Sequence, residues 1–185
     1  MGNFYGNITL ATNDEPAVAT ALRELRRDAY VAVVEDHVIV FDSVELDSNK
    51  VNRLLRDLTQ RIGCAGLAVM NADDDVLAYL LADRGRVVDE YDSNPGYDTG
   101  PAVPAIGGDP RLLSNAFSRP GAVERVRHIL HASSPTFELD RHQALVDALG
   151  LPTAVVGMGY RYISDGEAND AGLTNLQRIG RAPEP

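Results

Sequence analysis

Hydrophobic residues in the first 92 positions follow a period of two in some segments and a helical period in others, in a regular order. Residues 3–11 alternate with period two, which is typical of a strand. Apolar positions from Val51 to Ile62 recur every three or four residues, which is typical of an amphipathic helix. The pattern predicts strands at 3–11, 30–34, 38–41, 67–70, 76–81 and 86–91. It predicts one helix at 14–28 and a second that starts at the capping residues Asp47 and Ser48 and ends at Ile62.

This order of elements has a direct consequence for the fold. The first six elements follow the βαββαβ order of a ferredoxin-like core, and a further β-hairpin extends it. Short polar turns between neighbouring strands favour antiparallel pairing. We therefore predict an α+β fold with an antiparallel sheet, helices on one face and a helical C-terminal portion packed against the sheet.

A segment rich in proline and glycine separates the predicted sheet from the rest of the chain. Residues 93–109 contain three prolines and four glycines, and so long a loop in a compact domain is usually functional or a linker. Helical spacing returns afterwards, and residues 154–163 suggest a last strand. The predicted organisation is one domain over 1–164, made of a sheet core (1–92), a long loop (93–109) and a helical portion (110–164), followed by a polar tail (165–185).

Charge and cysteine content limit the partners and the compartment. The 27 acidic residues exceed the 17 basic ones and give a net charge of −10, which disfavours nucleic acid and favours basic partners. The same charge would also serve solubility alone. Cys64 is the single cysteine, and neither a signal peptide nor a membrane-spanning run is evident. We therefore expect a cytoplasmic protein that does not bind a membrane.

Acidic residues gather at two points that the predicted register brings to one end of the sheet. One is the turn after residues 67–70, and the other is the end of strand 86–91 with the loop that follows. Tyrosines beside such a loop are typical of interface anchors. A solvated hairpin turn is the alternative, because Asp is a common turn residue. The predicted binding residues are Asp73, Asp74, Asp75, Glu90, Tyr91, Asp92 and Tyr97.

Metal chemistry has a weaker basis in the sequence. Glu124, His128 and His131 lie three and four residues apart, so one helix face would carry all three. Zinc sites use such ligands, but the HExxH spacing is absent. We expect no cofactor and no metal, with these three residues as the weak candidates.

Three segments resemble a group of bacterial proteins that has no assigned activity. They are the opening GNFYGNI at residues 2–8, LAVMNADDDVL at 67–77 and DEYDSNPGY at 89–97. The resemblance extends over most of the chain. It implies no catalytic residues, because the group has none assigned.

The leading functional hypothesis is a non-enzymatic protein-binding domain, such as an adaptor, an inhibitor or an immunity-type protein. Its basis is the acidic surface and the loop flanked by tyrosines, without a recognisable catalytic constellation. One alternative is a metal-assisted hydrolase that uses Asp73, Asp75 and Asp92, or the Glu124 set. Another is a small-molecule sensor with its ligand between the sheet and the C-terminal helices. Exposed sheet edges would also allow a homodimer.

Overall fold

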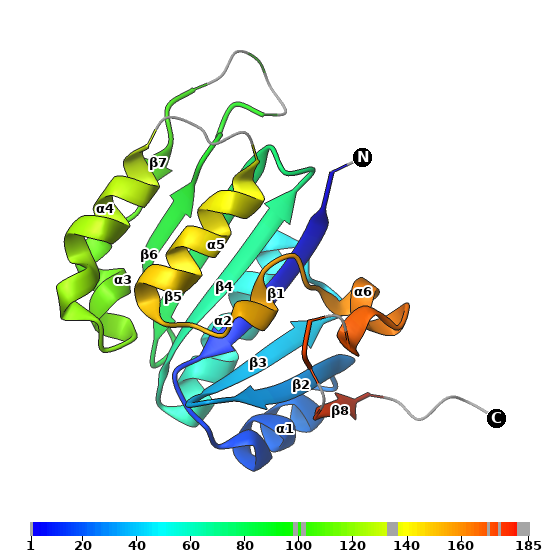
Figure 1. Ribbon diagram of the computed structural model, residues 1–185. Helices are drawn as coiled ribbons and strands as arrows, with labels where there is room; N and C mark the ends of the chain where they lie inside the picture. Colours follow the sequence, from blue (N-terminus) through cyan, green and yellow to red (C-terminus); the bar gives the residue numbers. More distant parts are fainter. Residues whose placement is uncertain are drawn as a thin grey trace.

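The computed structural model describes residues 2–97, 100, 103–132, 137–169, 171–173 and 175–180. Within them the chain forms an open antiparallel sheet with the strand order β7-β6-β5-β4-β1-β3-β2-β8 (Figure 1). The strands are β1 (Phe4–Leu10), β2 (Ala29–Val34), β3 (His37–Asp42), β4 (Ala65–Ala72), β5 (Val76–Asp83), β6 (Arg86–Asp92), β7 (Ile106–Gly107) and β8 (Leu176–Ile179). The helices are α1 (Glu15–Glu24), α2 (Ser48–Ile62), α3 (Pro110–Ala116), α4 (Val123–His131), α5 (Glu138–Leu149) and α6 (Tyr160–Ser164), with short 3-10 turns at Pro120–Ala122, Thr153–Val155 and Glu167–Asn169.

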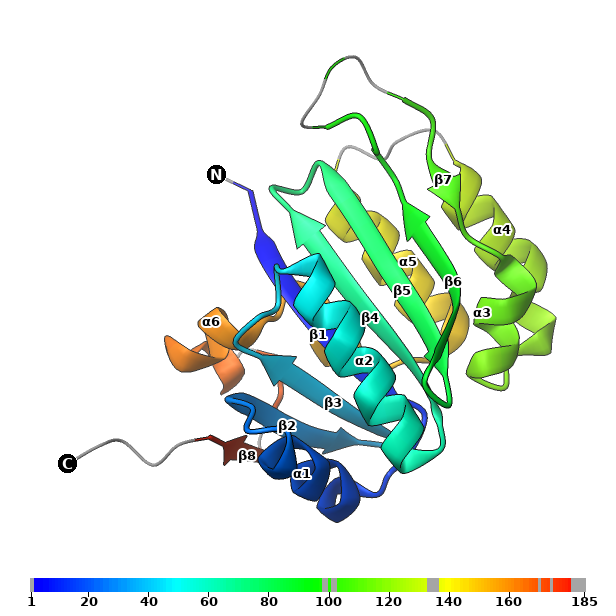
Figure 2. The same ribbon diagram turned by 180° about the vertical axis from the view of Figure 1, so that it is seen from behind.

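Helices α1 and α2 cover one face of the sheet: α2 lies in front of β4 and β5, and α1 lies beside β2 and β8 at one edge (Figure 2). Their apolar stripes bury Leu22, Leu55 and Leu58 against Val31 and Val40 of the sheet. Asp47 caps the start of α2 by accepting a hydrogen bond from the Lys50 backbone N–H at 3.0 Å, and Gly63 ends the helix in a left-handed conformation. A single amphipathic stripe thus places each early helix on this face.

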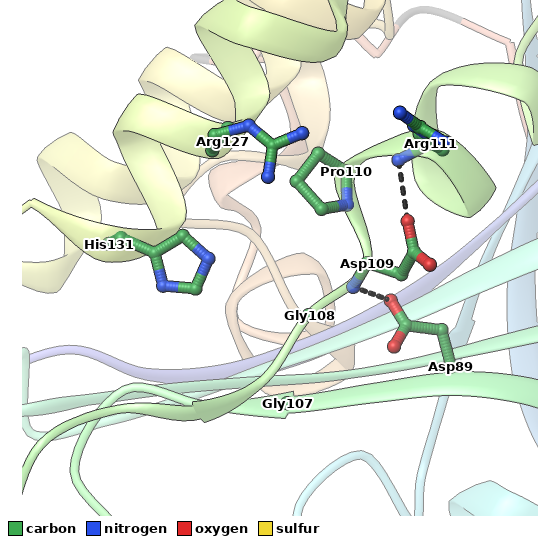
Figure 3. A pocket seen from close by; sticks show the side chains of 8 residues that line it. All are labelled: Asp89, Gly107, Gly108, Asp109, Pro110, Arg111, Arg127 and His131. Atoms are coloured by element: carbon green, nitrogen blue, oxygen red, sulfur yellow. Dashed lines mark hydrogen bonds between the residues drawn. The ribbon is translucent and has the colours of Figure 1, made fainter.

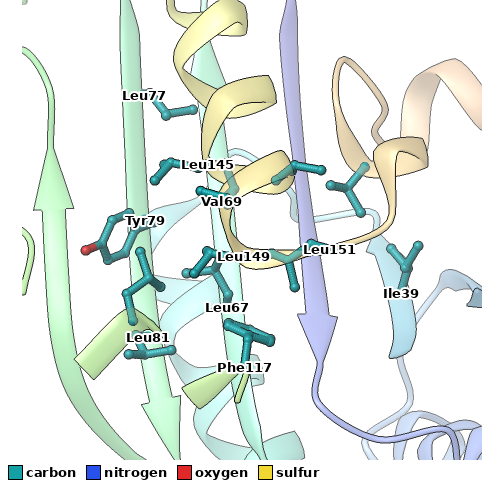
Figure 4. Close-up of a cluster of buried hydrophobic side chains, with 14 of the residues drawn as sticks. Ile39, Leu67, Val69, Leu77, Tyr79, Leu81, Phe117, Leu145, Leu149 and Leu151 are labelled. Atoms are coloured by element: carbon teal, nitrogen blue, oxygen red, sulfur yellow. The ribbon is translucent and has the colours of Figure 1, made fainter. Parts of the chain in front are cut away.

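The opposite face carries the helices of the second half of the chain. Helix α5 lies across β4 and β5, and α3 and α4 stand beside β6 (Figure 1). The close-up of this core shows Leu145 and Leu149 of α5 packed over Leu67 and Val69 of β4 (Figure 4). The molecule is therefore layered, with the sheet between two helical layers.

The α+β class, the antiparallel sheet and the strand and helix order of the first 92 residues are confirmed. The expected strand at 154–163 is wrong. A 3-10 turn and α6 occupy that segment instead. Asn7 of β1 explains the difference, because its side-chain amide donates to the Val155 and Met158 carbonyls at 2.8 and 2.9 Å. These bonds hold the segment across the sheet face, so its backbone is not available to a strand ladder.

Two short edge strands also differ from the expectations. Within the predicted loop, Ile106 and Gly107 pair with Asp92 and Tyr91 as β7. Within the predicted polar tail, β8 pairs antiparallel with β2, and Ile179 is buried there. Both strands are too short for a hydrophobic period to identify them. Among the described residues, none of the helices combines the length and apolar character that crossing a membrane requires.

Candidate functional site

The turn between β4 and β5 uses two of its three carboxylates to hold the start of the chain. Asp73 Oδ1 accepts a hydrogen bond from the Gly2 backbone N–H at 2.9 Å, and Asp74 Oδ2 accepts one from the Asn3 backbone N–H at 3.2 Å. Asp73 and Asp74 both adopt positive φ, which Asp tolerates better than most residues. Asp75 alone is exposed. The sequence reads as an acidic cluster, but most of it fastens β1 to the sheet.

The same turn also holds the start of α5. The Asp74 carbonyl accepts a hydrogen bond from the Glu138 backbone N–H at 2.8 Å. Glu138 is buried and pairs with Arg141 at 2.7 Å. Arg141 in turn donates to the Leu130 and Ala132 carbonyls at the end of α4. Each carboxylate of this region therefore has a structural partner, Asp75 excepted.

Asp92 and the start of the following loop lie at the same end of the sheet as this turn. Asp92 pairs with Ala78 in the ladder, and the Ser93 hydroxyl accepts a hydrogen bond from the Leu77 N–H at 2.9 Å. Asp92 Oδ1 accepts the Asn94 N–H at 2.9 Å, which is an Asx-turn. The antiparallel register therefore places the two acidic segments at the same end of the sheet.

The two predicted tyrosines have different surroundings. Tyr91 is 3% exposed, stacks on Tyr79 and donates its hydroxyl to the Leu130 carbonyl at 2.9 Å. Burial raises the pKa of Tyr91 to about 12, so its hydroxyl stays protonated at neutral pH. Tyr97 is 41% exposed, and its backbone N–H donates to the Asn94 carbonyl. Tyr91 is therefore a core residue, and Tyr97 is a surface residue.

Glu90 and Asp92 face the other side of the sheet, beside the first turns of α2 (Figure 2). A groove of about 390 Å³ lies there, and we call it the β5–β6 groove. Its half-buried apolar side chains are Met70, Ala78 and Leu80. Its remaining lining residues are Ser48, Asn49, Asn52, Tyr79, Glu90, Tyr91, Asp92, Ile106 and Gly107.

The polar and exposed side chains give this groove its chemical character. Neither Glu90 nor Asp92 forms an ion pair with any described residue. Asn49 and Asn52 come from the first turns of α2, and Ile106 is 56% exposed at the groove's other side. The groove therefore combines open carboxylates and amides with apolar contact area.

The weak metal candidates lie on α4 without forming a site. Glu124 pairs with Arg127 at 3.4 Å, and His128 is exposed. Over the described part of the chain, no group of three or more His, Cys, Asp or Glu side chains is arranged to hold a metal ion.

A second hollow, of about 550 Å³ and widely open to solvent, lies between the sheet edge and α4, and we call it the α4 cavity (Figure 3). It is lined by Asp89, Gly107, Gly108, Asp109, Pro110, Arg111, Arg127 and His131. Sequence reasoning found His131 here only as a metal candidate and did not identify Arg127 or Asp109 as site residues. The sole local signal was Asp109 before Pro110, a helix-start pattern that says nothing of a cavity.

Comparisons with family models, curated proteins and solved structures found no match to the chain. Its function must therefore be argued from these two sites.

Proposed function

We propose that this protein is a non-enzymatic binding domain whose β5–β6 groove receives a basic segment of a protein partner. The observation that carries the proposal is the pair of carboxylates, Glu90 and Asp92, beside apolar surface and without cations of their own. Lysine or arginine side chains of a partner would neutralise them. The apolar parts of the partner would cover Leu80 and the exposed Ile106.

The overall charge supports this choice of partner. A chain with net charge −10 attracts basic proteins and repels nucleic acid. We propose a cytoplasmic location. We also propose that the order β4-β1-β3-β2, with α1 and α2 on one face, is a ferredoxin-like unit. That unit would position β5, β6 and the groove, but the fold itself does not define the partner.

Affinity capture from a host lysate tests the proposal with matched variants. The wild-type protein and Asp36→Asn, an exposed acid in the β2–β3 turn, should retain the same basic polypeptide at physiological salt. The double variant Glu90→Gln/Asp92→Asn should retain about tenfold less of it. Capture should also weaken as salt is raised, because the contacts are exposed charges.

Three outcomes would oppose the proposal. One is that nothing is retained at physiological salt, and another is that the double variant captures as well as Asp36→Asn does. The third is that the retained species is a second copy of this chain, which would make the groove a dimer interface.

A further inference from the structure

The α4 cavity has acidic and basic groups on opposite sides. Arg127 and His131 extend from α4 toward the segment that carries Gly108 and Pro110 (Figure 3). Asp89 of β6 and Asp109 at the start of α3 line the side nearer the sheet. No ion pair joins either aspartate to Arg127 or His131, nor to Arg111 beside them. Arg127 pairs instead with the exposed Glu124 of its own helix, at 3.4 Å. Unlike charges thus share one cavity without closing on each other across it.

Hydrogen bonds fix the orientation of both aspartates. Asp89 Oδ2 accepts the Tyr79 hydroxyl at 2.7 Å and the Asp109 backbone N–H at 2.8 Å. Asp109 Oδ1 accepts the Arg111 backbone N–H at 2.8 Å (Figure 3). In each carboxylate these bonds use one oxygen, and the other has no hydrogen-bond partner in the described part of the chain. Each carboxylate is therefore held in place through one oxygen and keeps its other oxygen available as an acceptor.

The backbone between the two aspartates is held close to the sheet. Gly107 and Gly108 both have positive φ, and the Gly108 N–H donates to the Glu90 carbonyl at 2.8 Å. A side chain at Gly107 would collide with that carbonyl. The glycines thus permit the close approach that forms this wall of the cavity.

We propose that the α4 cavity binds a small zwitterion of the amino-acid type. The ligand's ammonium group would lie against Asp89 and Asp109, and its carboxylate would lie against Arg127 and His131. A purely anionic ligand would meet the two aspartates unfavourably, and a purely cationic one would meet the guanidinium. A ligand that carries both charges satisfies both sides at once. This site lies on the opposite sheet face from the β5–β6 groove and does not rest on the function proposed for it.

Calorimetric titration and thermal unfolding with L-alanine and L-glutamate test the proposal. The N-acetyl derivatives, which lack the ammonium group, and the amino-acid amides, which lack the α-carboxylate, are the matched probes. Free amino acid at 100 times its Kd should raise the melting temperature by roughly 5–10 °C. Both matched probes should bind at least about tenfold more weakly than the free amino acid.

Variants separate the two sides of the cavity. Arg127→Gln and Asp109→Asn should each weaken binding about tenfold or more. Asn is as good a helix N-cap as Asp, so Asp109→Asn keeps the start of α3. Arg125→Gln is the matched control, because Arg125 is exposed on the same helix but does not line the cavity.

The proposal is overturned if neither amino acid binds, or if the N-acetyl derivatives bind as tightly as the free amino acids. It is also overturned if Arg125→Gln weakens binding as much as Arg127→Gln does. Partner capture through the β5–β6 groove should be unchanged in Arg127→Gln, so the two proposals can fail separately.

Discussion

The turn after β4 and the last residues of β6 carry carboxylates at the same end of the sheet, yet the two regions use them differently. Asp73 and Asp74 accept backbone N–H groups of residues 2 and 3. Glu90 and Asp92 have no cationic partner among the described residues and border the β5–β6 groove. Carboxylate density alone therefore does not identify a binding site. What distinguishes the two regions is what their carboxylates hold: Asp73 and Asp74 bind the distant start of the chain, whereas Asp92 accepts only the nearby Asn94 N–H and borders the groove with Glu90.

The largest expected effect concerns the buried ion pair at the start of α5, a helix that the turn after β4 also holds in place. Arg141→Met should lower the free energy of unfolding by about 3–5 kcal/mol, because it leaves the buried Glu138 carboxylate without its cation. Urea unfolding measures this loss. The double variant Glu138→Leu/Arg141→Met should recover part of it, since both charges of this pair are removed, while the Leu130 and Ala132 carbonyls lose Arg141 as their donor. A loss below about 1 kcal/mol in the single variant would show that the pair is not structural.

An effect of comparable size is expected from pH, through His142, which lies one turn after Glu138 on α5. Burial lowers the pKa of His142 to about 3, and its Nδ1 lies 2.7 Å from the Tyr5 hydroxyl. The unfolded chain takes up this proton near pH 6.5, whereas the folded chain does so only near pH 3. The contribution of His142 to the free energy of unfolding is therefore fully present above pH 6.5. It is lost as pH falls toward 3, by up to about 1.4 kcal/mol per pH unit.

Urea unfolding between pH 7 and pH 4 checks this expectation in wild type and His142→Gln. The free energy of unfolding of the wild type should fall more steeply with decreasing pH than that of the variant. The difference between the two proteins gives the effect of His142 alone, because the carboxylates titrate in both. Parallel curves would mean that the folded protein accepts the proton at the same pH as the unfolded chain.

The smallest effects come from the acidic residues themselves and test the comparison directly. Asp74→Asn should cost about 1 kcal/mol, because a charge-assisted acceptor for the Asn3 N–H becomes a neutral one. Asn tolerates the left-handed backbone at this position, so the turn is preserved. Asp75→Asn and Glu90→Gln should each change stability by less than about 0.5 kcal/mol. If all three variants change the free energy of unfolding by the same amount, then carboxylates that hold the start of the chain stabilise the fold no more than the others do.

Much of the sheet could be predicted from the sequence, because its long elements carry clear periods. The α2 stripe from Val51 to Leu58 matches the structure, and β1 forms within the predicted range, although both of its faces are buried. The short strands β7 and β8 could not be found in this way. They form because their backbone groups pair with the exposed edges of β6 and β2. A run of two or four residues carries no sequence pattern that predicts such pairing.

The candidate site was less predictable than the fold. The register correctly placed Asp73 and Asp92 at one end of the sheet. It did not reveal that Gly2 and Asn3, seventy residues away in the chain, would occupy the turn's acceptors. Nor did it place Arg127 opposite Asp109, because exposed charges on separate helices have no sequence pattern that links them.

The central position of β1 also has a consequence for how the chain folds. β1 lies between β3 and β4, so its ladder partners run from Val38 to Ala72. During synthesis this strand is complete long before the second of its two neighbours exists. Pairings so distant in sequence slow folding and prolong the time for which apolar strand surface is exposed. β1 is thus paired along both edges only once β4 has been made, and β2 waits longer still for β8.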